Sequence, residues 1–134
     1  MRKVTYLITV TLISIAFASF TSVTTLKGVW QYAGGTANGK FEGAPVDYKL
    51  QRTYTDNGFT AIMIEKGYKP EKYEAGTYIL KGDTCLETST FNSQSPQLVG
   101  KTVAYIYTVT DGVLHLSATL PSGMVADDQW KKIK

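Results

Sequence analysis

Three two-residue turn signals, each between two runs of alternating apolar and polar residues, constrain the fold of this chain more than any other feature. They are Asn57-Gly58, Gly82-Asp83 and Asp111-Gly112, and such pairs connect neighbouring antiparallel strands in hairpins. The flanking runs are rich in Thr, Tyr, Val and Ile, which favour strands, and no useful helical period follows residue 18. We expect eight strands, over residues 26–33, 46–55, 58–65, 73–81, 84–91, 101–110, 113–120 and 125–133.

The connections between these runs alternate in length. The second, fourth and sixth are the tight turns, whereas the others are longer and cover residues 34–45, 66–72, 92–100 and 121–124. In an up-and-down meander, alternate connections lie at opposite ends of the sheet, so every long loop falls at one end. This asymmetry predicts an all-β fold: a single eight-stranded antiparallel up-and-down barrel with a closed base, an open mouth and no substantial helix.

The tight turns also predict which side chains point inward, because strand register follows from the turn. A turn at Asp111-Gly112 pairs Val109 with Leu114 and Tyr107 with Leu116, all apolar or aromatic. The opposite face of these strands carries threonines and the single histidine, His115. We therefore expect the apolar face inside and His115 outside.

The other two turns extend this inner face. The turn at Gly82-Asp83 pairs Leu80 with Cys85 and Tyr78 with Glu87, and a turn at Asn57-Gly58 pairs Tyr54 with Ala61 and Arg52 with Met63. Trp30 is expected to join from the first strand, and the side on which Trp130 lies stays open. The predicted inward, ligand-binding set is Tyr48, Arg52, Tyr54, Met63, Tyr78, Glu87, Tyr105 and Tyr107, with Leu116 beside it.

Several short motifs resemble a lipocalin-like, calycin-type family of exported bacterial domains of unknown function. They are Leu26-Lys27-Gly28-Val29-Trp30, Gly76-Thr77-Tyr78, Gly82-Asp83-Thr84-Cys85-Leu86-Glu87, Tyr105-x-Tyr107-x-Val109 and Trp130-Lys131-Lys132-Ile133. The resemblance implies an eight-stranded barrel and, by analogy, small-molecule binding. It also implies a barrel base built from Trp30, Trp130 and Lys132, with the lysine over the Trp30 ring in a cation–π contact. The chain departs from the pattern at Cys85, where an aromatic residue is expected.

The first residues predict export. Arg2 and Lys3 precede an apolar stretch over residues 4–17, and Ala16-Phe17-Ala18 has the pattern that signal peptidase cleaves. Fourteen helical residues span roughly 21 Å, less than the roughly 30 Å of a bilayer core. We expect a signal peptide over residues 1–18, a barrel domain over 24–134, and a periplasmic or secreted protein that does not insert into a membrane. The only cysteine lies far from the cleavage point, so a lipoprotein is not expected.

Charge and cysteine usage narrow the classes of partner. The whole chain carries a net charge of +3, and loss of Arg2 and Lys3 leaves +1, which offers no footprint for nucleic acid. With one histidine facing outward, neither a metal site nor a Ser-His-Asp arrangement is predicted. We expect no cofactor and no enzymatic activity. Cys85 reads as a small buried residue, and Asp127-Asp128 as a solvent-exposed acidic pair.

Arg52 and Glu87 are the sharpest candidates for chemistry, because the register sends both charges into the barrel. Either they satisfy each other internally, together with tyrosine hydroxyls, or Arg52 receives a ligand carboxylate or phosphate. The sequence favours an exported protein that holds a small, partly apolar or aromatic ligand in the barrel. The alternative is a protein-interaction module, such as an inhibitor or an envelope-assembly partner, that acts through its long loops around a filled barrel.

Overall fold

The computed structural model describes residues 25–134, which form nine strands and one short 3₁₀ turn. Within this range, no helix is long and apolar enough to cross a membrane. The expected signal peptide lies outside the described residues. The elements are β1 (Gly28–Ala37), β2 (Lys40–Gly43), β3 (Tyr48–Tyr54), β4 (Gly58–Glu65), β5 (Glu71–Lys81), β6 (Thr84–Asn92), η1 (Pro96–Leu98), β7 (Thr102–Thr110), β8 (Val113–Thr119) and β9 (Val125–Lys132).

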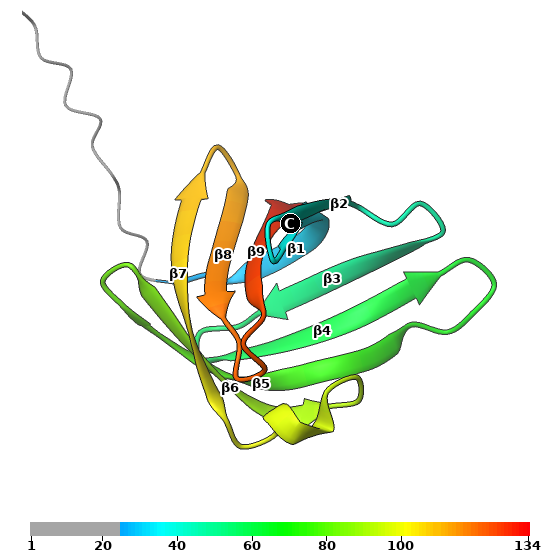
Figure 1. Cartoon of the computed structure of the whole chain (residues 1–134). Coiled ribbons are helices and arrows are strands. Elements are labelled where there is room, and N and C mark those ends of the chain that lie inside the picture. Colours follow the sequence, from blue (N-terminus) through cyan, green and yellow to red (C-terminus); the bar gives the residue numbers. More distant parts are fainter. Residues whose placement is uncertain (1–24) are drawn as a thin grey trace, which may run out of the picture.

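Eight of the strands close into a barrel (Figure 1). Strands β3 to β9 pair with their neighbours in chain order, β1 pairs with β3, and β1 also pairs with β9, every pair being antiparallel. The predicted all-β, eight-stranded up-and-down barrel is thus confirmed. Closure gives each of these eight strands a partner on both sides, and it gives the molecule an interior with two distinct ends.

The ninth strand corrects the expectation of a long loop over residues 34–45. β1 continues to Ala37, and a turn at Asn38-Gly39 leads into β2, which pairs with the far half of β1. Asn38 and Gly39 have φ values of 50° and 79°, which the type I′ hairpin turn requires and Asn-Gly tolerates best. Asn38-Gly39 is thus a fourth two-residue hairpin signal in the sequence, one that sequence reasoning missed within a glycine-rich segment.

The predicted strand register is right at the second and third of the three tight turns and wrong at the first. At Gly82-Asp83 and Asp111-Gly112 the pairs form as expected, including Tyr78 with Glu87 and Tyr107 with Leu116. At the first turn, however, Tyr54 pairs with Phe59 and Arg52 with Ala61, two residues away from the prediction.

The first turn differs because it is centred on Asp56-Asn57 and not on Asn57-Gly58. The Thr55 N–H donates to the Gly58 carbonyl at 2.8 Å, and the Gly58 N–H donates to the Thr55 hydroxyl at 3.0 Å. The threonine side chain therefore stabilises a turn that needs no positive φ. A shift of two residues returns each side chain to the same face, so the inward direction of Arg52 and Tyr54 is unchanged.

The base of the barrel is filled and closed. Leu26 lies across it, buried, and accepts a 2.8 Å hydrogen bond from the Trp30 indole. The Tyr78 hydroxyl donates to the Thr55 carbonyl at 2.6 Å, and this bond links β5 to the turn between β3 and β4. The Lys132 ammonium lies 5.5 Å from the centre of the Trp30 ring, so the contact implied by the resemblance is present. The two cavities described below open at the other end, the mouth.

Candidate functional site

Arg52 and Glu87 form an ion pair in the middle of the barrel, beneath the mouth. The Arg52 Nη2 group donates to Glu87 Oε1 at 2.5 Å, and both side chains are almost fully buried. Arg52 comes from β3 and Glu87 from β6, which face each other across the interior. Each charge lost its water on folding, and the partner replaces much of that solvation.

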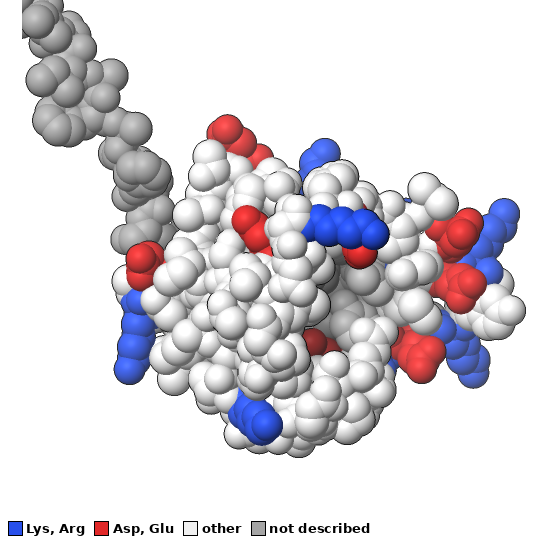
Figure 2. Space-filling view, viewed as in Figure 1, with Lys and Arg blue, Asp and Glu red and all other residues white. Residues whose placement is uncertain are grey.

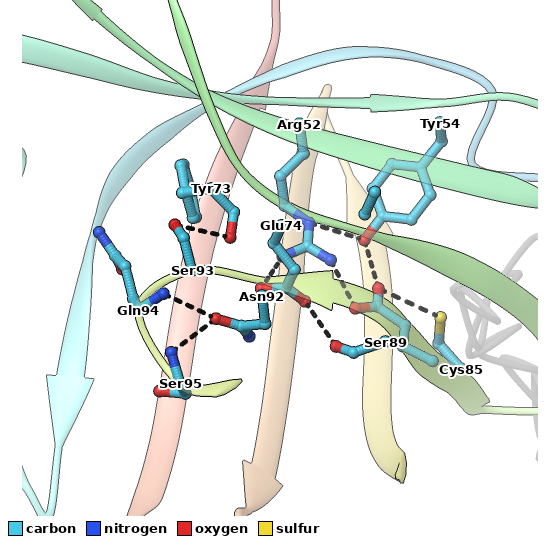
Figure 3. Close-up of polar contacts among 12 residues, drawn as sticks. Arg52, Tyr54, Tyr73, Glu74, Cys85, Ser89, Asn92, Ser93, Gln94 and Ser95 are labelled. Carbon is cyan, nitrogen blue, oxygen red and sulfur yellow. Dashed lines mark hydrogen bonds and ion pairs between the residues drawn. The ribbon is translucent and has the colours of Figure 1, made fainter. Parts of the chain in front are cut away.

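Tyr54 and two aromatic rings also contact the Arg52 guanidinium, and Figure 3 shows the polar part of this network. Nε donates to the Tyr54 hydroxyl at 3.2 Å, and Tyr54 in turn donates to Glu87 Oε2 at 2.5 Å. The guanidinium carbon lies 4.5 Å from the Phe59 ring centre and 5.5 Å from that of Trp130. Of the two readings left open by the sequence, the internal network is the one that forms: Glu87 and Tyr54 hold Nη2 and Nε, while Nη1 lies 4.0 Å from Glu74 Oε2.

Burial and neighbouring charges shift the pKa values of the groups in this network. Burial alone would lower the pKa of Arg52, but the charge of Glu87 and the neighbouring Tyr54 raise it well above its usual range. Burial raises the pKa of Tyr54, and likewise that of the Cys85 thiol, which is fully buried beside Glu87. Arg52 therefore stays charged, whereas Cys85 stays a protonated thiol. The expectation that Cys85 faces inward is confirmed, and its protonated state leaves it a poor nucleophile.

Two residues of the site were missed by sequence reasoning, Tyr73 and Glu74. The pairing of β4 with β5 shifts between Ala61 and Ile62, so Tyr73 is an extra residue on β5. Such a bulge breaks the alternation of faces, and both side chains are half-buried. Continuing the alternation back from Tyr78 would have indicated Glu74, but nothing local in the sequence indicates the bulge.

Glu74 is the second carboxylate near Arg52. Its Oε2 lies 4.0 Å from Arg52 Nη1, and its Oε1 accepts a 3.5 Å hydrogen bond from Ser89. Burial raises the pKa of Glu74 in spite of the opposing effect of Arg52, and burial raises the pKa of Tyr73 to about 12. Arg52 thus neutralises Glu87 more completely than it neutralises Glu74.

Asp128 corrects the expectation that Asp127 and Asp128 are both exposed to solvent. Asp127 faces outward, with Oδ1 at 4.0 Å from His115 Nδ1. Asp128 pairs with Leu116, on the inward face that Trp130 shares, and burial raises the pKa of its carboxyl. Trp130, whose direction the sequence left open, is buried. Alternation counted back from Trp130 would have placed Asp128 inside.

Two small cavities open at the mouth, and they share the side chains of Tyr105 and Leu120. The first has a volume of about 180 Å³ and lies among Tyr32, Tyr105 and Asp128. The second, of about 160 Å³, lies between Glu74, Glu87 and Tyr105. On the face viewed in Figure 2 the molecule is hollowed, with acidic atoms inside the hollow and along its rim.

The predicted ligand-binding set therefore divides by depth. Glu87 and Tyr105 line the cavities, whereas Tyr54, Tyr78 and Tyr107 are buried and belong to the hydrophobic core. Two further members, Tyr48 and Met63, line neither cavity; Tyr48 lies at the mouth end of β3 with 37% of its surface exposed. The surface on which a ligand could rest is smaller and more acidic than the sequence suggested.

The described part of the chain offers no set of side chains that could bind a metal ion. Residues 25–134 contain no group of three or more His, Cys, Asp or Glu side chains placed to hold a metal ion. His115 lies on the outer face, as expected, with 41% of its side chain exposed. Comparison of the chain with models of known protein families and with curated proteins gives no match.

Proposed function

We propose that the protein is an exported binding protein that holds one small, partly apolar molecule at the mouth of its barrel. The observation that carries this proposal is the contrast between the two ends. The base is packed with Leu26, Trp30 and Tyr78, while the mouth keeps two cavities that meet at Tyr105. Concave sites with apolar walls and a few converging polar groups are the usual places where small molecules bind.

The walls suit a flat molecule. Tyr32 and Tyr105 offer aromatic faces with hydroxyl tips, and Leu120 and Met124 add aliphatic surface. Each cavity is smaller than the roughly 300 Å³ at which pockets for drug-sized ligands begin. The ligand we propose is therefore small, about the size of a single substituted ring.

Export is part of the proposal and rests on residues 1–18, which precede the described part of the chain. No catalytic role is proposed for any residue. The buried network leaves Arg52 held by Glu87 and Tyr54, so its role in this proposal is to fix the floor of the site and not to react.

Native mass spectrometry of the protein purified from its own host tests the proposal. We expect a bound small molecule, released on denaturation, with the unmodified chain. The Tyr105→Ala variant should lose it, whereas Ile106→Ala should keep it, because Ile106 is the next residue on β7 and faces solvent. A chain that is empty under every growth condition, or equal retention in both variants, would count against binding at the mouth.

A second candidate, a protein-interaction module, is favoured by exposed apolar side chains on β2 and the loops at the mouth. Phe41, Val46 and Tyr68 are 69%, 95% and 73% exposed. Replacing Phe41 and Tyr68 together by serine should abolish recovery of a protein partner if the loops make the contact. Recovery that depends on Tyr105 and not on these two residues would exclude this candidate. Deletions should spare Gly34 and Gly35, because both pair with β9 and close the barrel.

A further inference from the structure

The walls of both cavities carry carboxylates and no cationic side chain. Glu42 and Asp128 line the first cavity, and Glu74 and Glu87 line the second. Neither lining contains a lysine, an arginine or the histidine. A concave site with walls of one sign concentrates ions of the opposite sign, because the low-dielectric walls focus the field.

The buried cation beneath the cavities does not cancel this charge. Arg52 contacts Glu87 directly at 2.5 Å and reaches Glu74 only at 4.0 Å. With Glu87 neutralised, Glu74 and Asp128 remain as acidic groups facing the mouth. An anionic ligand would meet these two carboxylates first, so the site disfavours the carboxylate or phosphate ligand that Arg52 alone would suggest.

Asp128 is the carboxylate best placed to meet a ligand. It shares the first cavity with the rings of Tyr32 and Tyr105, and none of the residues 25–134 donates a side-chain hydrogen bond to it. Room for it comes from Gly35 on the neighbouring strand: a Cβ atom at that position would lie 3.0 Å from Asp128 Oδ1 and 2.3 Å from the Asp127 carbonyl. The fold thus keeps a half-buried carboxylate open to the cavity.

Trp130, whose ring packs against that of the cavity residue Tyr32, also lacks a hydrogen-bond partner among the described residues. Trp130 is 4% exposed, its ring centre lies 5.2 Å from that of Tyr32, and its indole N–H has no acceptor among the residues described. Buried donors are nearly always satisfied in folded proteins. Trp130 lines neither cavity, so this donor is not assigned to the ligand.

We propose that the ligand is a small organic cation, an amine on a flat ring. Its ammonium donates to Asp128, and its ring lies against Tyr32 and Tyr105, whose π faces favour a cation. This inference rests on the proposed binding function and names the chemical class of its ligand. The second cavity, with Glu74 at its wall, extends the same acidic surface.

Three probes of nearly equal size and different charge test the inference on the full chain: tyramine, its neutral alcohol analogue tyrosol, and the anion 3-(4-hydroxyphenyl)propanoate. Isothermal titration at pH 7 should give a Kd for tyramine at least tenfold lower than for tyrosol, and no measurable binding of the anion. The preference for tyramine over tyrosol should weaken as salt is added, because it is electrostatic.

The Asp128→Asn variant isolates the proposed contact. It should reduce tyramine affinity at least tenfold and change tyrosol affinity less than twofold. Asp56→Asn removes the same charge from an exposed turn at the base, where its side chain is 80% exposed, and should leave both affinities unchanged.

The outcomes separate this inference from the function it rests on. Equal binding of all three probes, or a preference for tyramine that survives in Asp128→Asn, overturns the cation assignment and leaves small-molecule binding standing. Failure of all three probes overturns the cation assignment as well. In that case the mass of protein purified from its host decides separately whether a ligand of another class is bound.

Discussion

Arg52 and Glu87 lie 35 residues apart in the chain and join β3 to β6 through the interior of the barrel, with Nη2 and Oε1 2.5 Å apart. Because both groups are buried, the pair stabilises the fold only as long as both members are present. Removing one leaves an uncompensated charge in a low-dielectric interior, which is far more costly than losing an ion pair on the surface.

Single substitutions in this pair should therefore be strongly destabilising. We expect Glu87→Gln and Arg52→Met each to lower the free energy of unfolding by about 3–5 kcal/mol, measured by urea titration. The double variant should lose clearly less free energy of unfolding than the two single variants lose together, because the two charges are coupled. The matched control is the exposed pair of Lys27 and Asp56, 3.8 Å apart, where each substitution should cost at most about 1 kcal/mol. Equal losses at the two sites would contradict the buried network.

Asp128 should make the stability of the protein depend on pH. Burial raises the pKa of this carboxyl above its ordinary value of 3.8, so the folded state binds the proton more tightly than the unfolded chain does. The stability contributed in this way is fully present below pH 3.8 and is lost as pH rises through the raised folded pKa.

The Asp128→Asn variant should therefore unfold at a higher urea concentration than the unmodified chain at pH 7. The difference should close as the pH falls toward 3.8, and Asp56→Asn, on an exposed turn, is measured beside it as the control. A variant less stable than the unmodified chain at pH 7 would show that Asp128 supports the fold. The expected result would instead mark it as a group kept at a cost to stability, as functional groups often are.

Lys132 should contribute a small, specific stabilisation at the base through its contact with Trp30. Lys132→Met keeps most of the aliphatic stem and removes the ammonium, which lies 5.5 Å from the Trp30 ring centre. We expect a loss of about 0.5–1 kcal/mol, the usual size of an exposed cation–π contact, measured by thermal or urea unfolding. Lys131→Met changes the same charge on the adjacent residue and serves as the control. If the two variants behave alike, the ring contact contributes nothing.

Gly35 should be essential to the pairing of β1 with β9, the seam that closes the barrel. In Gly35→Ala the new Cβ would lie 2.3 Å from the Asp127 carbonyl oxygen, a backbone atom that moves only if the strands separate. We expect a loss of about 1–3 kcal/mol, as for overpacked interiors, and faster amide exchange along β9. Gly43→Ala is the control, because a Cβ at Gly43 meets no atom within 4 Å. Normal exchange in β9 of Gly35→Ala would show that the seam tolerates the methyl group.

The sequence predicted the bounds of the strands better than the register in which they pair. Seven of the eight expected runs match strands to within two residues at each end, and the eighth, 26–33, was extended by the Asn38-Gly39 hairpin. The alternation of side chains correctly turned Arg52, Glu87 and Cys85 inward. The register at the first turn was wrong because Thr55 satisfies the backbone of an Asp56-Asn57 turn. That bond joins residues three apart, and it selects the Asp56-Asn57 turn over the adjacent Asn57-Gly58 turn.

By itself, the sequence determined the number of barrel strands, their up-and-down order and the face on which most side chains lie, because the period of two and the turn residues act locally. Only the tertiary structure decided that Glu87 neutralises Arg52, that a bulge brings Tyr73 and Glu74 together toward the interior, and that Asp128 opens to the cavity. These outcomes depend on where distant backbones meet and on which charges share a desolvated space. Neither of these is encoded in any single stretch of the chain.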